Sequence, residues 1–330
     1  MKATATANSN IALVKYWGKR NNELNLPNNS SISMSLNKLY TTTTVEFSNG
    51  IKTDSLIIDG KKASKEEIER TSKHLSIVRK LARKEIFARV ESKNNFPKSA
   101  GLASSASGFA ALSLAATKAL DLHLDRKELS ILARQGSGSA SRSIEGGFVE
   151  WVKGSLEDGS DSYAKAIAPN DHWPELTMIV AVLTKKEKKT GSNAGMEKTP
   201  ATSPFYKCWL DTVEQDLEKT KKAILEKNFS LLGKTAEMNC LKMHSTMLTT
   251  EPHLIYWEPE TIKVIKEVLS LREQGTECYF TIDAGPQVKV LCMKKNSEKI
   301  KKYFSAMKEV KEIFVCTAGE GAKLTEKDLF

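Results

Sequence analysis

Residues 97–108 read PKSAGLASSASG and run directly into FAALSLAATKALDL, so a stretch of very small residues opens a predicted helix. The first N–H groups of a helix have no partner within it, and the helix dipole adds partial positive charge there, so such an end binds phosphate readily. The stretch matches neither G-x-x-x-x-G-K-[ST] nor G-x-G-x-x-G, which excludes the two common phosphate loops. Taken alone, it is read equally well as a capped helix whose small residues allow close packing.

Around this loop, strand patterns and amphipathic helix patterns alternate, which predicts an α/β protein. The segment LTMIVAVLT at 176–184 is apolar on both faces and is expected at the centre of a sheet. The polar segment that follows it marks the expected boundary between a lobe of residues 1–184 and a lobe of residues 185–330. Further strands are expected at 41–47, 55–60, 88–97, 146–152 and 313–317, with a strand, turn and strand at 278–293, and helices at 65–84, from the small-residue loop to Leu120, and at 126–134, 205–226, 229–247, 258–275 and 297–309.

The composition is typical of a soluble globular protein. The 330 residues are 40% hydrophobic and 27% charged, and no apolar run approaches the roughly 20 residues of a membrane span. The first residues lack the apolar core of a signal peptide, so we expect a cytoplasmic protein with no membrane partner. Five cysteines without a C-x-x-C pair, and five histidines without a cluster, predict neither a disulfide framework nor a metal site built from protein side chains.

The formal net charge of +10 indicates an acidic partner, either nucleic acid or a phosphorylated small molecule. The densest basic run, KKEKK at 185–189, contains no aromatic residue, and the chain carries no nucleic-acid-binding signature. We therefore expect no nucleic-acid partner. A solvated loop explains the basic run as well as a function does.

Two further segments are suited to binding anions. KYWGKR at 15–20 sets basic side chains around Tyr16 and Trp17, which suits a phosphate pocket with an aromatic wall or, as an alternative, a packed surface. GSGSASRS at 136–143 combines four hydroxyls with Arg142 and suits a carboxylate or a diphosphate. A serine-rich turn beside a surface arginine would give the same pattern.

The segment TIDAGP at 281–286 places Asp283 directly after an apolar strand. A carboxylate there can hold or accept the proton of a hydroxyl, or it can simply shape a turn. Two serine and glycine cradles, a lysine cluster and one carboxylate together suit phosphoryl transfer, in which catalysis is mostly positioning and neutralisation of charge. The residues alone thus indicate an anionic substrate and a nucleotide without naming the reaction.

The chain resembles the diphosphomevalonate decarboxylase family of the GHMP kinase superfamily, most closely its shorter Gram-positive bacterial form. The resemblance implies an α/β (α+β), two-lobed GHMP kinase fold, with a ribosomal-S5-domain-2-like N-terminal lobe, a ferredoxin-like C-terminal lobe and the site between them. It also implies a homodimer. The motifs that carry it are, in chain order, NIALVKYWGKR, LPNNSSISMSL, NNFPKSAGLASSASGFAAL, LARQGSGSASRSIEGGFVEW, AGMEKT, FYKCWLD, LKMHST and CYFTIDAGPQVKVL.

The reaction that this resemblance implies uses ATP and Mg²⁺. It converts mevalonate 5-diphosphate, also called (R)-5-diphosphomevalonate, into isopentenyl diphosphate, CO₂, ADP and phosphate in the mevalonate pathway. Phosphorylation of the tertiary 3-hydroxyl makes it a good leaving group. Sister enzymes that decarboxylate mevalonate 5-phosphate or only phosphorylate the 3-hydroxyl are the nearest alternatives, and a basic nucleic-acid-binding protein is the alternative of another class.

Site residues follow from the same resemblance. Asp283 orients or deprotonates the hydroxyl, Arg142 binds the substrate carboxylate, and Lys19 completes the catalytic set. Asn193 replaces a common Thr or Arg of the family. The implied substrate-binding residues are Tyr16, Trp17, Gly18, Lys19, Arg70, Ser137, Gly138, Ser139, Ala140, Ser141, Arg142 and Asn193, and the implied ATP-binding residues are Gly101, Leu102, Ala103, Ser104, Ser105, Ser107, Lys188 and Ser192.

Overall fold

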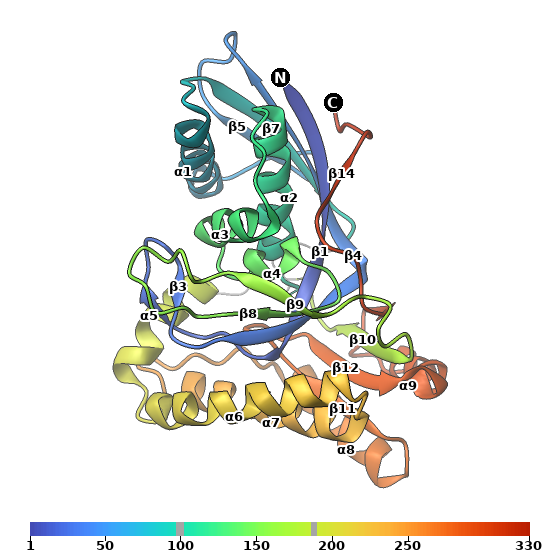
Figure 1. The fold of residues 1–330 in the computed structure, drawn as a ribbon. Helices are drawn as coiled ribbons and strands as arrows, with labels where there is room; N and C mark the ends of the chain where they lie inside the picture. Colours follow the sequence, from blue (N-terminus) through green and yellow to red (C-terminus); the bar gives the residue numbers. More distant parts are fainter. Residues whose placement is uncertain (97–101, 186–189) are drawn as a thin grey trace.

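The computed structural model describes residues 1–96, 102–185 and 190–330, which form an upper and a lower lobe in the view of Figure 1. The strands are β1 (Lys2–Val14), β2 (Lys19–Asn21), β3 (Leu26–Pro27), β4 (Ser31–Ser48), β5 (Ser55–Ile58), β6 (Lys61–Lys62), β7 (Phe87–Asn94), β8 (Phe148–Trp151), β9 (Ala164–Ala168), β10 (Leu176–Val182), β11 (Cys278–Thr281), β12 (Val288–Met293), β13 (Glu312–Cys316) and β14 (Lys323–Thr325). The helices are α1 (Lys65–Ala82), α2 (Ser104–Ala119), α3 (Arg126–Gly136), α4 (Ala140–Ile144), α5 (Ser192–Thr202), α6 (Tyr206–Leu225), α7 (Phe229–Leu248), α8 (Pro259–Glu273) and α9 (Lys294–Ser305).

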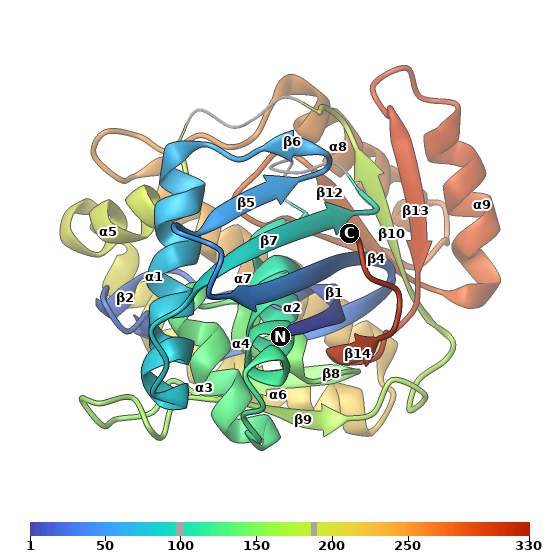
Figure 2. The same cartoon turned by 90° about the horizontal axis from the view of Figure 1, so that it is seen from above.

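The upper lobe is built on the sheet β14-β1-β4-β7-β5-β6, with β8 and β9 continuing from β4. Helix α2 packs on β1 and β4 through a face of small residues, including Ala110, Ala111 and Ala115, which allows close approach to the sheet. Figure 2 shows α1, α2 and α3 beside this sheet and the two chain ends near each other. The terminal carbonyl oxygen of Phe330 accepts a hydrogen bond from Lys2 Nζ at 2.8 Å.

The lower lobe contains the sheet β11-β12-β10-β13. All seven residues of β10 are buried, and the strand lies between β12 and β13, so the expectation of a central strand is confirmed. Helices α8 and α9 cover one face of the sheet, while α7 and the long strands of the upper lobe cover the other. Strands β10 to β13 thus form the lower sheet, while β14 near the end of the chain returns to the upper sheet. The domain boundary expected at 184 remains a prediction.

Most expected elements lie within two or three residues of their expected bounds. Asp125 caps α3 as expected, since its Oδ1 accepts the N–H of Glu128 at 2.8 Å and Glu128 bonds back in a capping box. Sequence patterns did not predict α4, α5, β9 or β14, because these elements are short or rich in Ser, Thr and Pro. None of the helices in the described ranges combines the length and apolarity that crossing a membrane requires.

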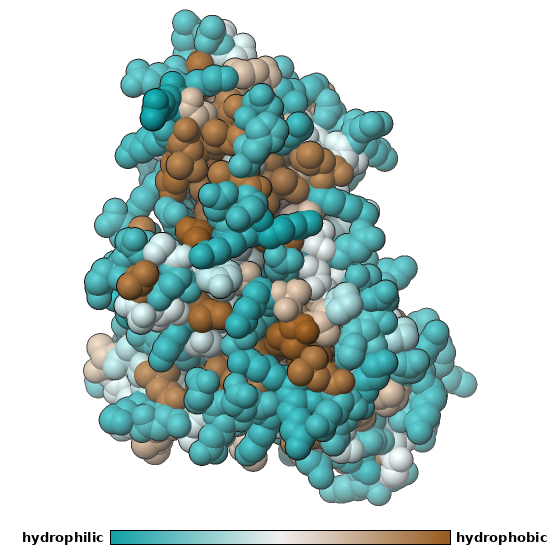
Figure 3. Space-filling model, viewed as in Figure 1, coloured by the Kyte–Doolittle hydropathy of each residue, from teal (hydrophilic) through white to brown (hydrophobic). Residues whose placement is uncertain are grey.

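The surface in Figure 3 is polar over most of its area, with apolar residues gathered over the helices of the upper lobe. Some large apolar side chains are exposed to solvent, among them Leu81 and Phe87. Single exposed apolar residues are normal on a folded protein.

Candidate active site

A cleft of about 700 Å³ lies between the lobes and collects most of the predicted site residues. Its walls come from the end of β1, the first turns of α1, α2 and α5, helix α4 and the β11–β12 loop, with Met243 of α7 beside them. Segments far apart in sequence therefore meet at one place. The predicted residues that line it are Tyr16, Trp17, Arg70, Ala103, Ser104, Ser105, Ser139, Arg142, Ser192, Asn193 and Asp283.

Asp283 lies in the loop between β11 and β12 and is held by two lysines. Its Oδ1 accepts a bond from Lys15 Nζ at 2.7 Å, and Lys289 Nζ is 3.4 Å from its Oδ2. Both lysine side chains are buried, at 1% and 0% exposure, whereas the Asp283 side chain is 24% exposed to the cleft. The carboxylate thus faces the cleft while both its oxygens are fixed from within the protein.

These ammonium groups also set the protonation of the carboxylate. Burial raises the pKa of Asp283, but the charges of Lys15 and Lys289 outweigh burial and hold the pKa at about 2. The carboxylate is therefore ionised at any physiological pH. Such a group is a weak base, and it acts chiefly by accepting a hydrogen bond and orienting the donor.

Arg142 stands in α4, buried to 3% exposure, with part of its guanidinium in the same cleft. Its Nε donates to Asn10 Oδ1 at 3.2 Å and its Nη1 donates to Ser31 Oγ at 2.6 Å, so two neutral side chains fix its orientation. Burial lowers the pKa of Arg142 to about 10, which leaves it charged at pH 7. A buried, oriented guanidinium suits the bidentate binding of a carboxylate.

Tyr16 closes the cleft beside Arg142. Its ring meets Trp151 edge to face at 4.7 Å, and Gly138 lies so close that a Cβ there would approach the Tyr16 hydroxyl to 2.9 Å. Burial raises the pKa of the Tyr16 phenol, so it stays a neutral donor. Its hydroxyl has no partner within the described part of the chain, which leaves that donor available to a ligand.

The start of α2 presents the second half of the cleft. Ala103, the N-cap residue, has a left-handed conformation with φ of 56° and offers no side-chain cap to the first N–H groups. Ser104 is half-buried and Ser105 is exposed, and both line the cleft. Free N–H groups next to two hydroxyls at a helix start form an anion cradle of the expected kind.

Ser107, predicted to contact ATP, faces the protein interior instead. It is fully buried and its Oγ lies 2.7 Å from Thr41 Oγ1 and 3.3 Å from the Ser104 carbonyl oxygen. Ser107 is the fourth residue of SSAS, three positions after Ser104, and its hydroxyl contacts Thr41 of β4. The Ser107 hydroxyl is therefore engaged within the protein, and its assignment to ATP binding stays a prediction.

Lys19, Arg70 and Asn193 form a corner that opens into a side pocket of about 230 Å³. Lys19 Nζ donates to Asn193 Oδ1 at 3.2 Å, and Arg70 donates through Nε and Nη2 to the carbonyl oxygen of Gly136 at 3.2 and 2.8 Å. Burial, reinforced by the charge of Arg70, lowers the pKa of Lys19 to about 8. Two cations this close indicate a site for a dianionic group.

The remaining predicted residues shape the cleft without lining it. Gly101 and Lys188 lie outside the described residues. Gly18 has φ of +89° and packs against Tyr206, where a Cβ would come within 2.0 Å of the hydroxyl oxygen. The side chains of Leu102, Ala140 and Ser141 are buried in the protein, and Ser137 Oγ donates to Ser105 Oγ at 3.4 Å. The assignment of these residues to ligand binding stays a prediction.

Sequence reasoning missed several residues of the site. Lys15 was visible within KYWGKR but was not assigned a role, and Lys289 lies in an apolar strand as VKVLC, where a charged residue is itself a signal. Asn10 accepts a hydrogen bond from Arg142 and so orients it. In the sequence, the one hint of this role is that a polar residue stands directly before the apolar run IALV. The pairing of these residues depends on contacts between distant segments.

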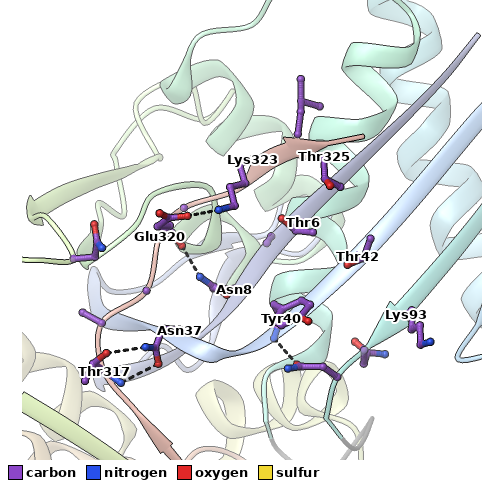
Figure 4. Close-up of a pocket in the computed structure, with 18 of the residues that line it drawn as sticks. Thr6, Asn8, Asn37, Tyr40, Thr42, Lys93, Thr317, Glu320, Lys323 and Thr325 are labelled. Atoms are coloured by element: carbon purple, nitrogen blue, oxygen red, sulfur yellow. Dashed lines mark hydrogen bonds and ion pairs between the residues drawn. The ribbon is translucent and has the colours of Figure 1, made fainter. Parts of the chain in front are cut away.

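A hollow of about 1000 Å³, larger than the cleft, lies elsewhere, and none of the predicted residues line it. Figure 4 shows it between the C-terminal segment and a sheet face that carries Thr6, Thr42 and Lys93. Two of its side chains bond to the opposite wall: Asn8 Nδ2 donates to the Glu320 carbonyl oxygen at 2.9 Å and Asn37 Nδ2 donates to Thr317 Oγ1 at 2.8 Å. This groove is the seam by which the C-terminal segment attaches to the sheet.

Comparison with known proteins gives full-length matches. A family model described as the diphosphomevalonate decarboxylase-like N-terminal domain matches residues 7–164, and one described as the mevalonate 5-diphosphate decarboxylase C-terminal domain matches residues 178–327. The diphosphomevalonate decarboxylase of Candida albicans is 40% identical over 312 residues, which cover 90% of this chain and 86% of that protein.

Solved structures match equally well. The mevalonate diphosphate decarboxylase from Enterococcus faecalis is 44% identical with a TM-score of 0.91, covering 99% of both chains. A structure described as MDDEF in complex with MVAPP, AMPPCP and magnesium is 44% identical with a TM-score of 0.93, again covering 99% of both chains. The two-lobed fold expected from the sequence motifs is thereby confirmed.

Proposed function

The chain belongs to the diphosphomevalonate decarboxylase family, and on that premise we propose that it converts mevalonate 5-diphosphate and ATP into isopentenyl diphosphate, CO₂, ADP and phosphate. The observation that carries the proposal is the Asp283 carboxylate, held at 2.7 Å by Lys15, in one cleft with Arg142 and the start of α2. A carboxylate, a carboxylate-binding arginine and an anion cradle are the three parts that this reaction requires.

At the charged end of the cleft, the substrate carboxylate binds the guanidinium of Arg142. The 3-hydroxyl then donates its hydrogen bond to Asp283, which lies near enough to Arg142 for their charges to interact. With a pKa of about 2, Asp283 orients the hydroxyl oxygen towards the γ-phosphorus rather than abstracting its proton beforehand. As the 3-oxygen bonds to the γ-phosphorus, the bond from that phosphorus to the ADP oxygen breaks and the hydroxyl proton passes to Asp283. The C3–O bond then breaks with loss of phosphate, the electron pair of the bond to the carboxylate carbon forms the alkene, and CO₂ leaves.

The diphosphate of the substrate binds at the corner made by Lys19 and Arg70. Both side chains carry pKa values lowered by burial, so each charge is incompletely solvated and binds an anion strongly. Arg70 is stacked on Phe109 at 4.5 Å and bonded to Gly136, which fixes its direction. The neutral Tyr16 hydroxyl supplies a further donor between this corner and Arg142.

ATP phosphates bind at the start of α2, with Ser104 and Ser105 as side-chain contacts and Ser192 facing them from α5. Oxygen donors that Mg²⁺ prefers lie there, namely these hydroxyls and the carboxylates of Glu66 and Glu67. In the described ranges no three His, Cys, Asp or Glu side chains cluster for a metal, which fits an ion held chiefly by phosphate oxygens and water. When bound, Mg²⁺ neutralises charge that develops on the transferred phosphoryl group.

The deciding assay incubates the protein with ATP, Mg²⁺ and either mevalonate 5-diphosphate or mevalonate 5-phosphate and follows ADP and CO₂ together. Equal amounts of both products from the diphosphate are expected. ADP without CO₂ would identify a 3-kinase, and a preference for the monophosphate would identify the sister decarboxylase. Polyanion binding that weakens steeply with salt, without ATP turnover, would favour the nucleic-acid-binding alternative.

The working form is proposed to be a cytoplasmic homodimer, as the family resemblance implies. Light scattering of the purified protein at micromolar concentration should give twice the mass of one chain. A single-chain mass across that range would contradict the dimer without affecting the proposed reaction.

A further inference from the structure

Lys289 is a fully buried lysine in the middle of an apolar strand. It pairs with Thr281 of β11 and Val180 of β10, so it lies between two neighbouring strands rather than at an edge. Its flanking residues Val288 and Val290 face the core under α8 and α9, which places Lys289 on the face towards the cleft. Burying an ammonium costs several kcal/mol unless a partner compensates it, so this position requires an explanation.

The partners of Lys289 include the catalytic carboxylate and a backbone carbonyl. Its Nζ lies 3.4 Å from Asp283 Oδ2 and donates to the Gln287 carbonyl oxygen at 3.4 Å. Lys15 already provides a full ion pair at the other oxygen of Asp283. Lys289 therefore adds a second cation at the oxygen of Asp283 that Lys15 does not hold.

Within the described residues, the titratable groups that influence Asp283 from the elements packed around it are cationic or neutral. Lys15 comes from the end of β1, Lys289 from β12 and Arg142 from α4. From α7, burial lowers the pKa of His244 to about 3 and raises the pKa of the Cys240 thiol, so both are uncharged at pH 7. Asp283 is therefore the one carboxylate among three cations in this set.

We propose that Lys289 is a positioning residue for the reaction, which fixes the second oxygen of Asp283 so that two lysines rather than one set the direction of the carboxylate. This inference rests on the proposed function. With one oxygen held by Lys15 and the other by Lys289, the carboxylate cannot rotate, and it meets the 3-hydroxyl in one orientation. The two lysines also keep it ionised, and Lys289, which does not line the cleft, acts through Asp283 alone.

The test replaces Lys289 by Met, which keeps the length of the side chain and removes the charge. We expect kcat to fall about ten- to a hundred-fold while the KM values for ATP and mevalonate 5-diphosphate change little, because the binding groups remain. The pH at which kcat/KM falls off on the acidic side, the acidic limb, should rise by about one pH unit or more. The reason is that a cation within about 4 Å lowers the pKa of a carboxyl group by about that amount, and the variant lacks this cation. The variant Lys289→Gln, which can still donate a hydrogen bond, should show the same shift in pH.

The matched control is Lys294→Met, the same change at an exposed residue at the start of α9, and it should behave as the wild type. A normal acidic limb together with normal kcat in both Lys289 variants would overturn the inference. A loss of stability without a shift of the limb would also overturn it, because it would mean a structural role only.

A second measurement does not depend on turnover. Because the folded pKa of Asp283 is depressed, its contribution to stability is present above the unfolded pKa and is lost as pH falls towards 2. The difference in Tm between wild type and Lys289→Met should therefore depend on pH between about 2 and 4. In an Asp283→Asn background that dependence should vanish. Absence of CO₂ production by the wild type would contradict the proposed function, whereas a flat Tm difference would contradict the contact itself.

Discussion

The two ends of the cleft are built on different physical principles. At one end, Asp283 is fixed by charges buried within the protein, with Lys15 and Lys289 at 1% and 0% exposure. At the other end, the start of α2 offers backbone N–H groups and the hydroxyls of Ser104 and Ser105, and it carries no charge of its own. The Asp283 end is thus built from ion pairs. The α2 end is built from backbone N–H groups and hydroxyls that line the cleft.

This difference indicates what each end does before substrate arrives. Buried ions must be compensated during folding, so the direction and ionisation of Asp283 are set in the free enzyme. Backbone donors at a helix start remain solvated until phosphate replaces water. The carboxylate end should therefore control kcat and its pH dependence, and the cradle should control the affinity for ATP.

The largest effect is expected from Asp283→Asn. An amide keeps the shape but cannot accept the hydroxyl proton, so kcat should fall by about 10²- to 10⁴-fold. Binding of a non-hydrolysable ATP analogue, measured by calorimetry, should stay nearly unchanged because the cradle is intact. Near-normal turnover, or a parallel loss of nucleotide binding, would contradict the separation of the two ends.

A smaller but still large effect is expected from Arg142→Gln. Loss of one charge-assisted hydrogen bond to the substrate carboxylate costs about 1.5–3 kcal/mol, which corresponds to about a 10- to 100-fold loss of kcat/KM. The KM for ATP should not change. Arg126→Gln, in the same lobe but bonded to the Ile144 and Ala322 carbonyl oxygens outside the cleft, is the control for a lost arginine. Equal losses in both variants would mean that Arg142 acts through folding alone.

An intermediate effect is expected from raising the pH past the lowered pKa of Lys19. Its ammonium loses the proton as pH rises through about 8, so kcat/KM for mevalonate 5-diphosphate should fall about tenfold per pH unit above that value. Lys19→Arg, which stays charged, should remove this basic limb. A basic limb that persists in Lys19→Arg would assign it to another group.

The smallest effect is expected from the serines of the cradle. Ser105→Ala removes one hydrogen bond and should raise the KM for ATP about three- to tenfold. Ser107→Ala, which breaks the contact with Thr41, should leave that KM unchanged and lower the free energy of unfolding by about 1 kcal/mol. If Ser107→Ala weakened ATP binding as much as Ser105→Ala, the assignment of the two faces of α2 would be wrong.

Local motifs predicted the cradle better than the charged end. The loop before α2, the N-cap at Asp125 and the central strand β10 were all visible because capping and periodicity act over a few residues. The resemblance carried by the motifs named the family, which the comparisons confirm. Lys15 was not assigned because its partner Asp283 lies 268 residues away in sequence. Lys289 lies close to Asp283 in sequence, but its side chain could be paired with Asp283 only once the β11–β12 hairpin was seen.

The sequence by itself determined the elements, the family and the types of group in the site, because these follow from short-range pattern and residue identity. Only the tertiary structure decided that Ser107 turns inward, that Lys15 and Lys289 share Asp283, and that Asn10 and Ser31 orient Arg142. Hydrogen bonds and ion pairs act over a few ångströms. Their partners lie more than a hundred residues apart in sequence in most of these contacts, so folding alone brings them together.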